Sequence, residues 1–151
     1  MNMKINYPKI LKKNMTNVLK DVLHEIENNG IKEGHSLYIT FNTNKNNVIL
    51  PKWLNKKNPK EMTIVIQHEY WNLKVLEDKF EILLSFNDVK VNLIVPFESI
   101  ISFADPYANF GLRISSEEKN LKRKKDGTNV NKKIIKKKNN VIDFTKYKKL
   151  N

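Results

Sequence analysis

The sequence predicts an α+β protein in which an N-terminal amphipathic helix precedes a small, strongly bent antiparallel sheet or partial barrel, followed by a disordered tail. Three observations predict this order. Apolar residues first recur every three or four positions, as on one face of a helix. They then alternate with polar residues, as along half-buried strands. The last 36 residues hold 13 of the 28 Lys and Arg and only four of the 16 Asp and Glu, and only four residues of 117–140 are apolar.

The predicted helix begins near Pro8, a residue suited to a first helical turn, and ends at Gly30. Its apolar stripe consists of Leu11, Met15, Val18, Leu19, Val22, Leu23 and Ile26. The stripe is wider than a helix needs if it packs on only one sheet. Two alternatives stay open: part of the stripe meets a second subunit, or the helix's own domain covers all of it.

Alternation of apolar and polar residues predicts the strands that follow the helix. They are placed at 37–42, 62–66, 73–75, 80–86, 89–95 and 110–114. Asn87 and Asp88 suit a two-residue hairpin turn. Segment 48–51 can be only a short edge strand, because Pro51 lacks an amide N–H. Segment 96–103 is predicted to form a short helical turn.

The charge distribution divides the chain into three parts. Residues 116–151 carry +9 of the net charge of +12, so residues 1–115 form a nearly balanced domain of a size that supports one core. Lysine and asparagine dominate 116–140, which is predicted to be a disordered basic linker. Apolar and aromatic residues return at 141–151, and this pattern indicates a tethered peptide ligand.

The composition excludes several kinds of site. Without cysteine there are no disulfides, thiolate metal sites or Cys nucleophiles, which fits a reducing cytosol. No apolar run approaches the length of a signal peptide or of a membrane span. We therefore expect a cytoplasmic protein that has no metal site and does not associate with a membrane.

Catalytic patterns are missing from the sequence. The three histidines are His24, His35 and His68, and His68 adjoins Glu69. Adjacent residues on a strand point to opposite faces, so this pair is not expected to act as an acid and base together. There is no His-Glu-x-x-His helix, glycine-rich phosphate loop or Gly-x-Ser-x-Gly elbow. The chain is predicted to be no enzyme and to need no cofactor.

Nucleic-acid binding is the alternative hypothesis. The lysine-rich runs 122–125 and 136–138 could neutralise RNA or DNA phosphates in a salt-dependent way. Stacking aromatics belong to such a site as well, but most aromatic residues of this domain occupy predicted core positions and lack interleaved Lys or Arg.

Segment 102–111 holds the densest group of residues of unusual type in the domain. Its aromatic residues could wall a groove for an extended peptide, Ala104 and Gly111 permit close backbone approach, and Asn109 offers a donor and an acceptor. The alternative is a proline-containing connector that closes the barrel with its aromatics in the core. The residues by themselves leave both readings open.

Several sequence segments, in the same order along the chain, resemble the SspB (stringent starvation protein B) family, in its alphaproteobacterial branch. They are 37–41, 48–54, 61–68, 84–89, 95–97 and 103–112. Together they cover the domain from about residue 31 to 114, and 141–149 is similar to the short terminal motif of that branch.

The resemblance implies an adaptor that enhances the specificity of the ClpXP protease. It implies a homodimeric domain, with an Sm-like or SH3-like sheet, that binds the ssrA degradation tag, and a tail whose end docks on ClpX. By position, the predicted tag-binding residues are Ser85, Phe86, Phe103, Ala104, Asn109 and Phe110. The predicted ClpX-docking residues are Val141, Ile142, Phe144, Tyr147, Lys148 and Lys149.

Overall fold

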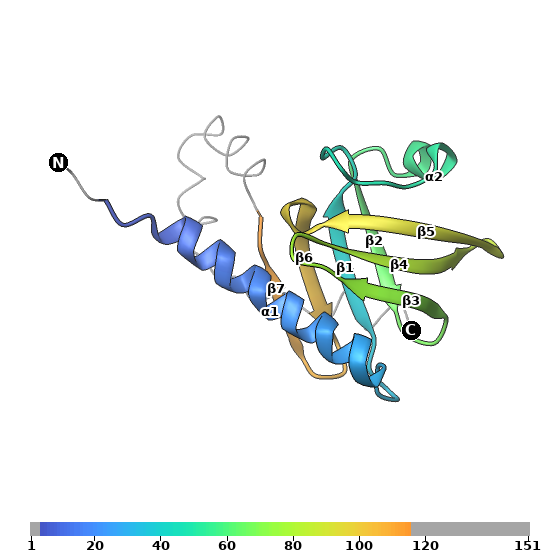
Figure 1. Cartoon of the computed structure of the whole chain (residues 1–151), viewed down its shortest axis with the longest axis horizontal. Coiled ribbons are helices and arrows are strands. Elements are labelled where there is room, and N and C mark those ends of the chain that lie inside the picture. Colours follow the sequence, from blue (N-terminus) through green and yellow to red (C-terminus); the bar gives the residue numbers. More distant parts are fainter. Residues whose placement is uncertain (1–3, 116–151) are drawn as a thin grey trace, which may run out of the picture.

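The computed structural model describes residues 4–115 (Figure 1). Helix α1 (Tyr7–Asn29) begins after Asn6, whose side chain accepts a hydrogen bond from the Lys9 N–H and so caps the first turn. It ends at Gly30, where φ is +75° and the N–H donates to the Ile26 carbonyl. The predicted helix and its stop at Gly30 are confirmed, since a positive φ favours glycine at this position.

Two antiparallel sheets follow the helix, and the α+β prediction is confirmed. The strands are β1 (Leu37–Asn42), β2 (Glu61–Ile66), β3 (Tyr70–Val75), β4 (Lys79–Phe86), β5 (Val89–Pro96), β6 (Ile100–Asp105) and β7 (Phe110–Arg113). One sheet has the order β2-β1-β6-β7 and the other β3-β4-β5. The described strands thus form two sheets that do not close into a barrel.

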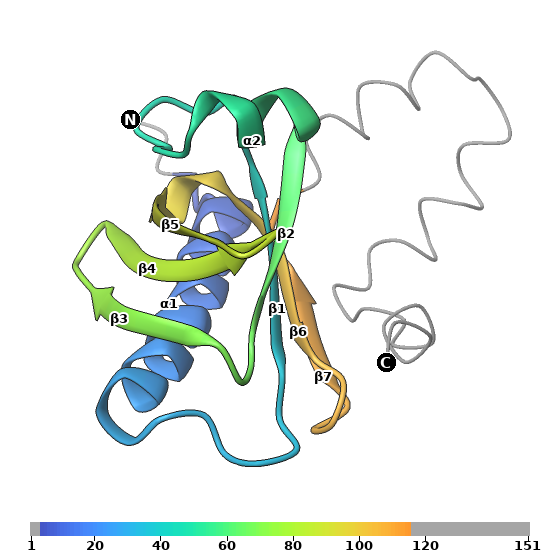
Figure 2. The same ribbon diagram turned by 90° about the vertical axis from the view of Figure 1, so that its right-hand side faces the viewer.

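The core lies between α1 and the two sheets (Figure 2). Helix α1 contributes the buried residues Met15, Leu19, Leu23 and Ile26. The largest fully buried side chains are those of Phe41, Phe80 and Phe103. Asn87 and Asp88 join β4 to β5 with φ of +52° and +67°, the left-handed conformation of a two-residue hairpin turn, as predicted.

One predicted element is wrong, and another is shorter than predicted. Segment 48–51 forms no strand, because only Ile49 makes a bridge, to Ile94, and helix α2 (Lys52–Lys57) follows at once. The helical turn predicted over 96–103 is confined to Phe97–Ser99, and the rest belongs to β6. Because β6 lies between β1 and β7 and is mostly buried, it shows no alternation of apolar and polar residues.

The apolar stripe of α1 is only partly covered. The N-terminal half of the helix extends beyond the sheets (Figure 1). There Leu11 is 52% exposed and Val18 is 37% exposed. The alternative in which the described domain covers the whole stripe is therefore wrong.

The predicted linker 116–140 and docking motif 141–151 lie outside the described residues. Within residues 4–115, no helix combines the length and apolar character needed to cross a membrane.

Candidate functional site

Strand β2 has a free edge. It is the last strand of its sheet and pairs only with β1. The Thr43 N–H donates to the Lys60 carbonyl at 3.0 Å, and this pair continues the β1–β2 register, so hydrogen-bonded pairs fall on every second position from Lys60. Thr63 and Val65 occupy the intervening positions, and their N–H and C=O groups point away from β1.

The side chains of β1 and β2 agree with this assignment. Thr63 stands opposite Thr40, and their hydroxyl oxygens are 2.7 Å apart. Side chains approach closely at the positions of an antiparallel ladder that exchange no backbone hydrogen bonds. The backbone groups of Thr63 and Val65 are therefore available to another extended chain.

Strand β4 also extends past one of its neighbours. Tyr70 opposite Leu84 is the last pair between β3 and β4. Beyond it, Ser85 and Phe86 pair only with Lys90 and Val89 of β5. The final two residues of β4 thus have no strand beside them on the β3 side.

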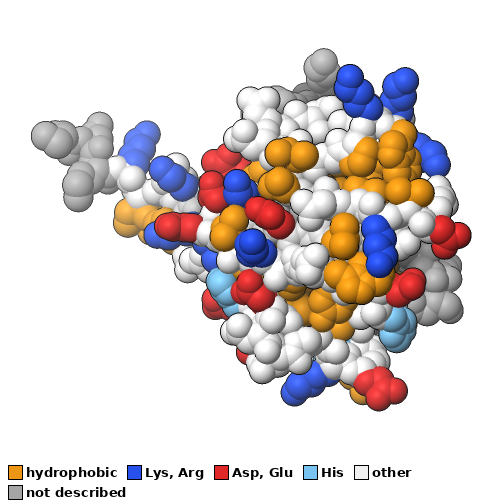
Figure 3. All heavy atoms as spheres, turned by 45° about the vertical axis from the view of Figure 1, so that its right-hand side comes forward, with side chains coloured by type: hydrophobic (Ala, Val, Ile, Leu, Met, Phe, Trp, Pro, Cys, Tyr) orange, Lys and Arg blue, Asp and Glu red, His pale blue; other side chains and the backbone are white. Residues whose placement is uncertain are grey.

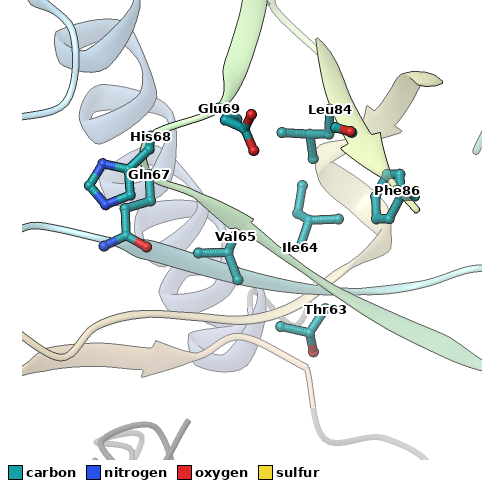
Figure 4. Close-up of a pocket in the computed structure, with 9 residues that line it drawn as sticks. Thr63, Ile64, Val65, Gln67, His68, Glu69, Leu84 and Phe86 are labelled. Carbon is teal, nitrogen blue, oxygen red and sulfur yellow. The ribbon is translucent and has the colours of Figure 1, made fainter. Parts of the chain in front are cut away.

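A pocket of about 340 Å³ lies where these two strand edges meet (Figure 4). Its lining residues are Thr63, Ile64, Val65, Gln67, His68, Glu69, Leu84, Ser85 and Phe86. In Figure 4 the side chain of Ile64 on β2 points toward Leu84 and Phe86 on β4, whereas that of Thr63 points away from them. Polar side chains from the β2–β3 connection stand at one end. A hollow with a mixed apolar and polar lining and unpaired backbone groups suits an extended peptide, which can pair through its backbone and insert small side chains.

The structure separates the six predicted tag-binding residues into two groups. Ser85 and Phe86 line the pocket. Phe103 and Ala104 are buried in β6, and Phe110 is 45% exposed at the start of β7. Asn109, with φ of +56°, is exposed in the turn between those strands. Strand β1 lies between β2 and β6, so this second group is not brought to the pocket.

Sequence reasoning missed most of the residues that line the pocket. Thr63 and Val65 were visible as part of a β-branched run, but nothing in that run marks β2 as an edge strand. His68 and Glu69 were expected to lie on a strand, but β2 ends at Ile66, and both residues lie in the bend that follows, where both line the pocket.

A polar contact holds the β6–β7 turn. The Nδ1 atom of His35 lies 2.6 Å from Oδ2 of Asp105, and Oδ1 of Asp105 accepts a hydrogen bond from the Ala108 N–H. The Tyr107 ring packs edge-on against His35 with centroids 4.6 Å apart. Through these contacts His35 and Asp105 hold the β6–β7 turn in place, which is a structural role. Among residues 4–115, no group of three His, Cys, Asp or Glu side chains could hold a metal ion.

Comparison with known families gives one finding. A family model described as SspB, stringent starvation protein B, matches residues 8–147, which include the whole pocket and most of the tail. Comparison with curated proteins gives no match.

Proposed function

The chain belongs to the SspB family, a family of adaptors rather than of enzymes, and from this premise we propose that it is a cytoplasmic adaptor for ClpXP. It binds the ssrA tag, and other degrons of similar chemistry, in the pocket between β2 and β4. Its C-terminal motif docks on ClpX. The adaptor performs no chemistry, because tethering alone raises the local concentration of substrate at the unfoldase.

The pocket between two unpaired strand edges carries this proposal. A degradation tag is an unstructured peptide, and a free strand edge recognises such a peptide through backbone hydrogen bonds. Phe86 is only partly buried and supplies apolar wall for small side chains, whereas Ile64 and Leu84, which also line the pocket, are almost fully buried. Ser85 and Phe86 are retained from the predicted tag-binding residues, and Thr63 and Val65 join them.

The proposed docking function rests on the sequence of the tail. Val141, Ile142, Phe144 and Tyr147 are the proposed apolar anchors, with Lys148 and Lys149 as charged partners. The family match reaches residue 147 and so includes the four apolar positions. A linker of about 25 residues (116–140) places the motif within reach of a separate partner while the domain holds the tag.

Titration of a fluorescent peptide that ends in the ssrA tag tests tag binding. We expect saturable binding by fluorescence anisotropy that persists at physiological and higher salt, because backbone pairing and apolar contacts dominate it. A scrambled peptide of the same composition is the control. Equal binding of both peptides, or no binding together with salt-sensitive RNA binding, would contradict the proposal and favour the nucleic-acid alternative.

The uncovered part of α1 supports the proposed homodimer. Tyr7, Leu11 and Val18 lie on the same side of the helix as the buried residue Met15, and they are 68%, 52% and 37% exposed. A run of exposed apolar side chains on a helix that extends beyond its own sheets suits an interface with a second copy.

Replacement of Leu11 by glutamate is expected to dissociate the dimer. Burying the new carboxylate at an apolar interface costs at least about 3 kcal/mol, which weakens association by roughly 100-fold. Light scattering after size exclusion should change from near twice the chain mass of 17.8 kDa to near that mass. Lys13→Gln changes the net charge by the same amount on the opposite side of the helix and should leave the dimer intact. A dimer that survives Leu11→Glu would place the interface elsewhere.

A further inference from the structure

A basic surface adjoins one end of the pocket. Residues 43–60 hold five lysines and no Asp or Glu, whereas the rest of 1–115 holds 10 Lys and Arg and 12 Asp and Glu. The five exposed lysines, here called the α2 basic surface, are Lys45, Lys52, Lys56, Lys57 and Lys60. Within residues 4–115, no carboxylate comes within ion-pair distance of them. The positive charge of the domain is thus concentrated here and is not neutralised locally.

Apolar side chains are exposed among these lysines. Trp53 is 38% exposed, and Nζ of Lys57 lies 5.8 Å from the centroid of its ring. Ile49, just before α2, is 55% exposed. In Figure 3, basic side chains cluster beside hydrophobic ones at the upper edge of the molecule, where α2 lies in Figure 1. The surface can therefore contact both carboxylates and apolar groups of a bound chain.

The α2 basic surface is continuous with the free edge of β2. Lys60 precedes the pocket residue Thr63 by three positions, which is about 10 Å along an extended strand. Two hydrogen bonds from Thr43, to the carbonyls of Lys60 and Asn58, attach this segment to the end of β1. Glu61 is the first carboxylate encountered along β2. A peptide that pairs along β2 and continues past Thr63 runs beside these lysines.

The opposite end of the pocket has a different charge. Gln67, His68 and Glu69 line it there, and no lysine does. The α2 end thus carries five lysines against the single carboxylate of Glu61, whereas Glu69 lines the other end without a lysine. This asymmetry favours one placement of a bound peptide that carries charge at only one of its ends.

We propose that the α2 basic surface binds acidic residues that flank the bound tag, so that the substrates this adaptor prefers carry carboxylates on the α2 side of the pocket. The inference rests on the proposed function, because the tag must first occupy the pocket. Charge complementarity favours acidic flanking residues as the partner of this surface. A second copy of the surface, or the tail with its charge of +9, would bring like charges together. Each exposed ion pair contributes little, but several pairs together should tighten binding about three- to tenfold.

The test compares tag peptides that differ only in flanking charge. Three glutamates, or three glutamines as the matched control, are added to either end of a fluorescent ssrA peptide, and each peptide is titrated into the full chain. We expect the glutamates at one end to tighten binding about three- to tenfold over glutamines at low salt, and this advantage to vanish near 0.5 M salt. The double variant Lys57→Gln, Lys60→Gln should lose most of the advantage and bind the glutamine peptides as the unaltered protein does. The variant Lys9→Gln, Lys13→Gln, with the same change of net charge on the part of α1 that extends beyond the sheets, should keep it.

Other outcomes assign the surface differently. Equal affinity for glutamate and glutamine peptides, or an advantage that persists in the Lys57 and Lys60 variant, overturns the inference while tag binding itself stands. Failure of every peptide, glutamine peptides included, overturns the proposed function together with the inference. A short single-stranded oligonucleotide that binds through Lys57 and Lys60, without any glutamate advantage, assigns the surface to nucleic acid.

Discussion

Replacement of Val65 by proline is expected to weaken binding of the ssrA peptide at least about tenfold, or about 1.4 kcal/mol, without unfolding the domain. The Val65 N–H points to the free edge of β2, so proline removes a donor offered to the peptide and no hydrogen bond to β1. Its ring also occupies space at the strand edge. Edge positions whose N–H faces away from the sheet are where strands tolerate proline.

Two controls separate lost pairing from lost structure. Val65→Thr keeps the N–H, the β-branched shape and, at a side chain already 36% exposed, most of the packing, so its affinity should stay near that of the unaltered protein. Circular dichroism and thermal unfolding of the proline variant establish whether it is folded. A complementary titration alters the peptide instead, by methylating one backbone amide at a time. If the folded proline variant and all methylated peptides bind normally, the β2 edge is not the recognition element.

Deletion of residues 141–151 is expected to abolish the adaptor's stimulation of ClpXP while leaving tag affinity unchanged. The proposed tag site lies wholly within the described domain, and the proposed docking residues lie wholly within the deleted segment. Tethering supplies an effective concentration of up to the order of a millimolar, and its loss returns degradation at low substrate concentration to the rate without an adaptor. Degradation of a tagged fluorescent protein by ClpXP and anisotropy of the tag peptide measure the two functions separately.

An internal deletion of equal length provides the matched control. Removal of 11 residues from 120–130 shortens the linker but keeps the docking residues, so it should retain most of the stimulation. A fall in tag affinity on removal of 141–151 would contradict the separation into two modules. Full stimulation without 141–151 would place the ClpX contact in another part of the chain.

The sequence alone determined the elements that follow a simple period. The helix from Tyr7 to Asn29, its stop at Gly30, the β4–β5 hairpin and its turn at Asn87 and Asp88 follow from local backbone preferences and from patterns that one buried face imposes. Strand β6 and helix α2 escaped this reasoning. Strand β6 is mostly buried and so has no alternation to recognise, and α2 spans only six residues.

The candidate site depended on tertiary structure. Ser85 and Phe86 were predicted through a family resemblance, but their partners across the pocket, Thr63 and Val65, come from a strand whose edge position depends on sheet order. Phe103 and Phe110 were predicted with them through the same resemblance, yet strand order places β1 between β2 and β6. Composition and the spacing of apolar residues show which face of each segment is buried. A strand offers a binding edge only where no other strand pairs with it. That pairing is a long-range property of the fold, and only the tertiary structure decides it.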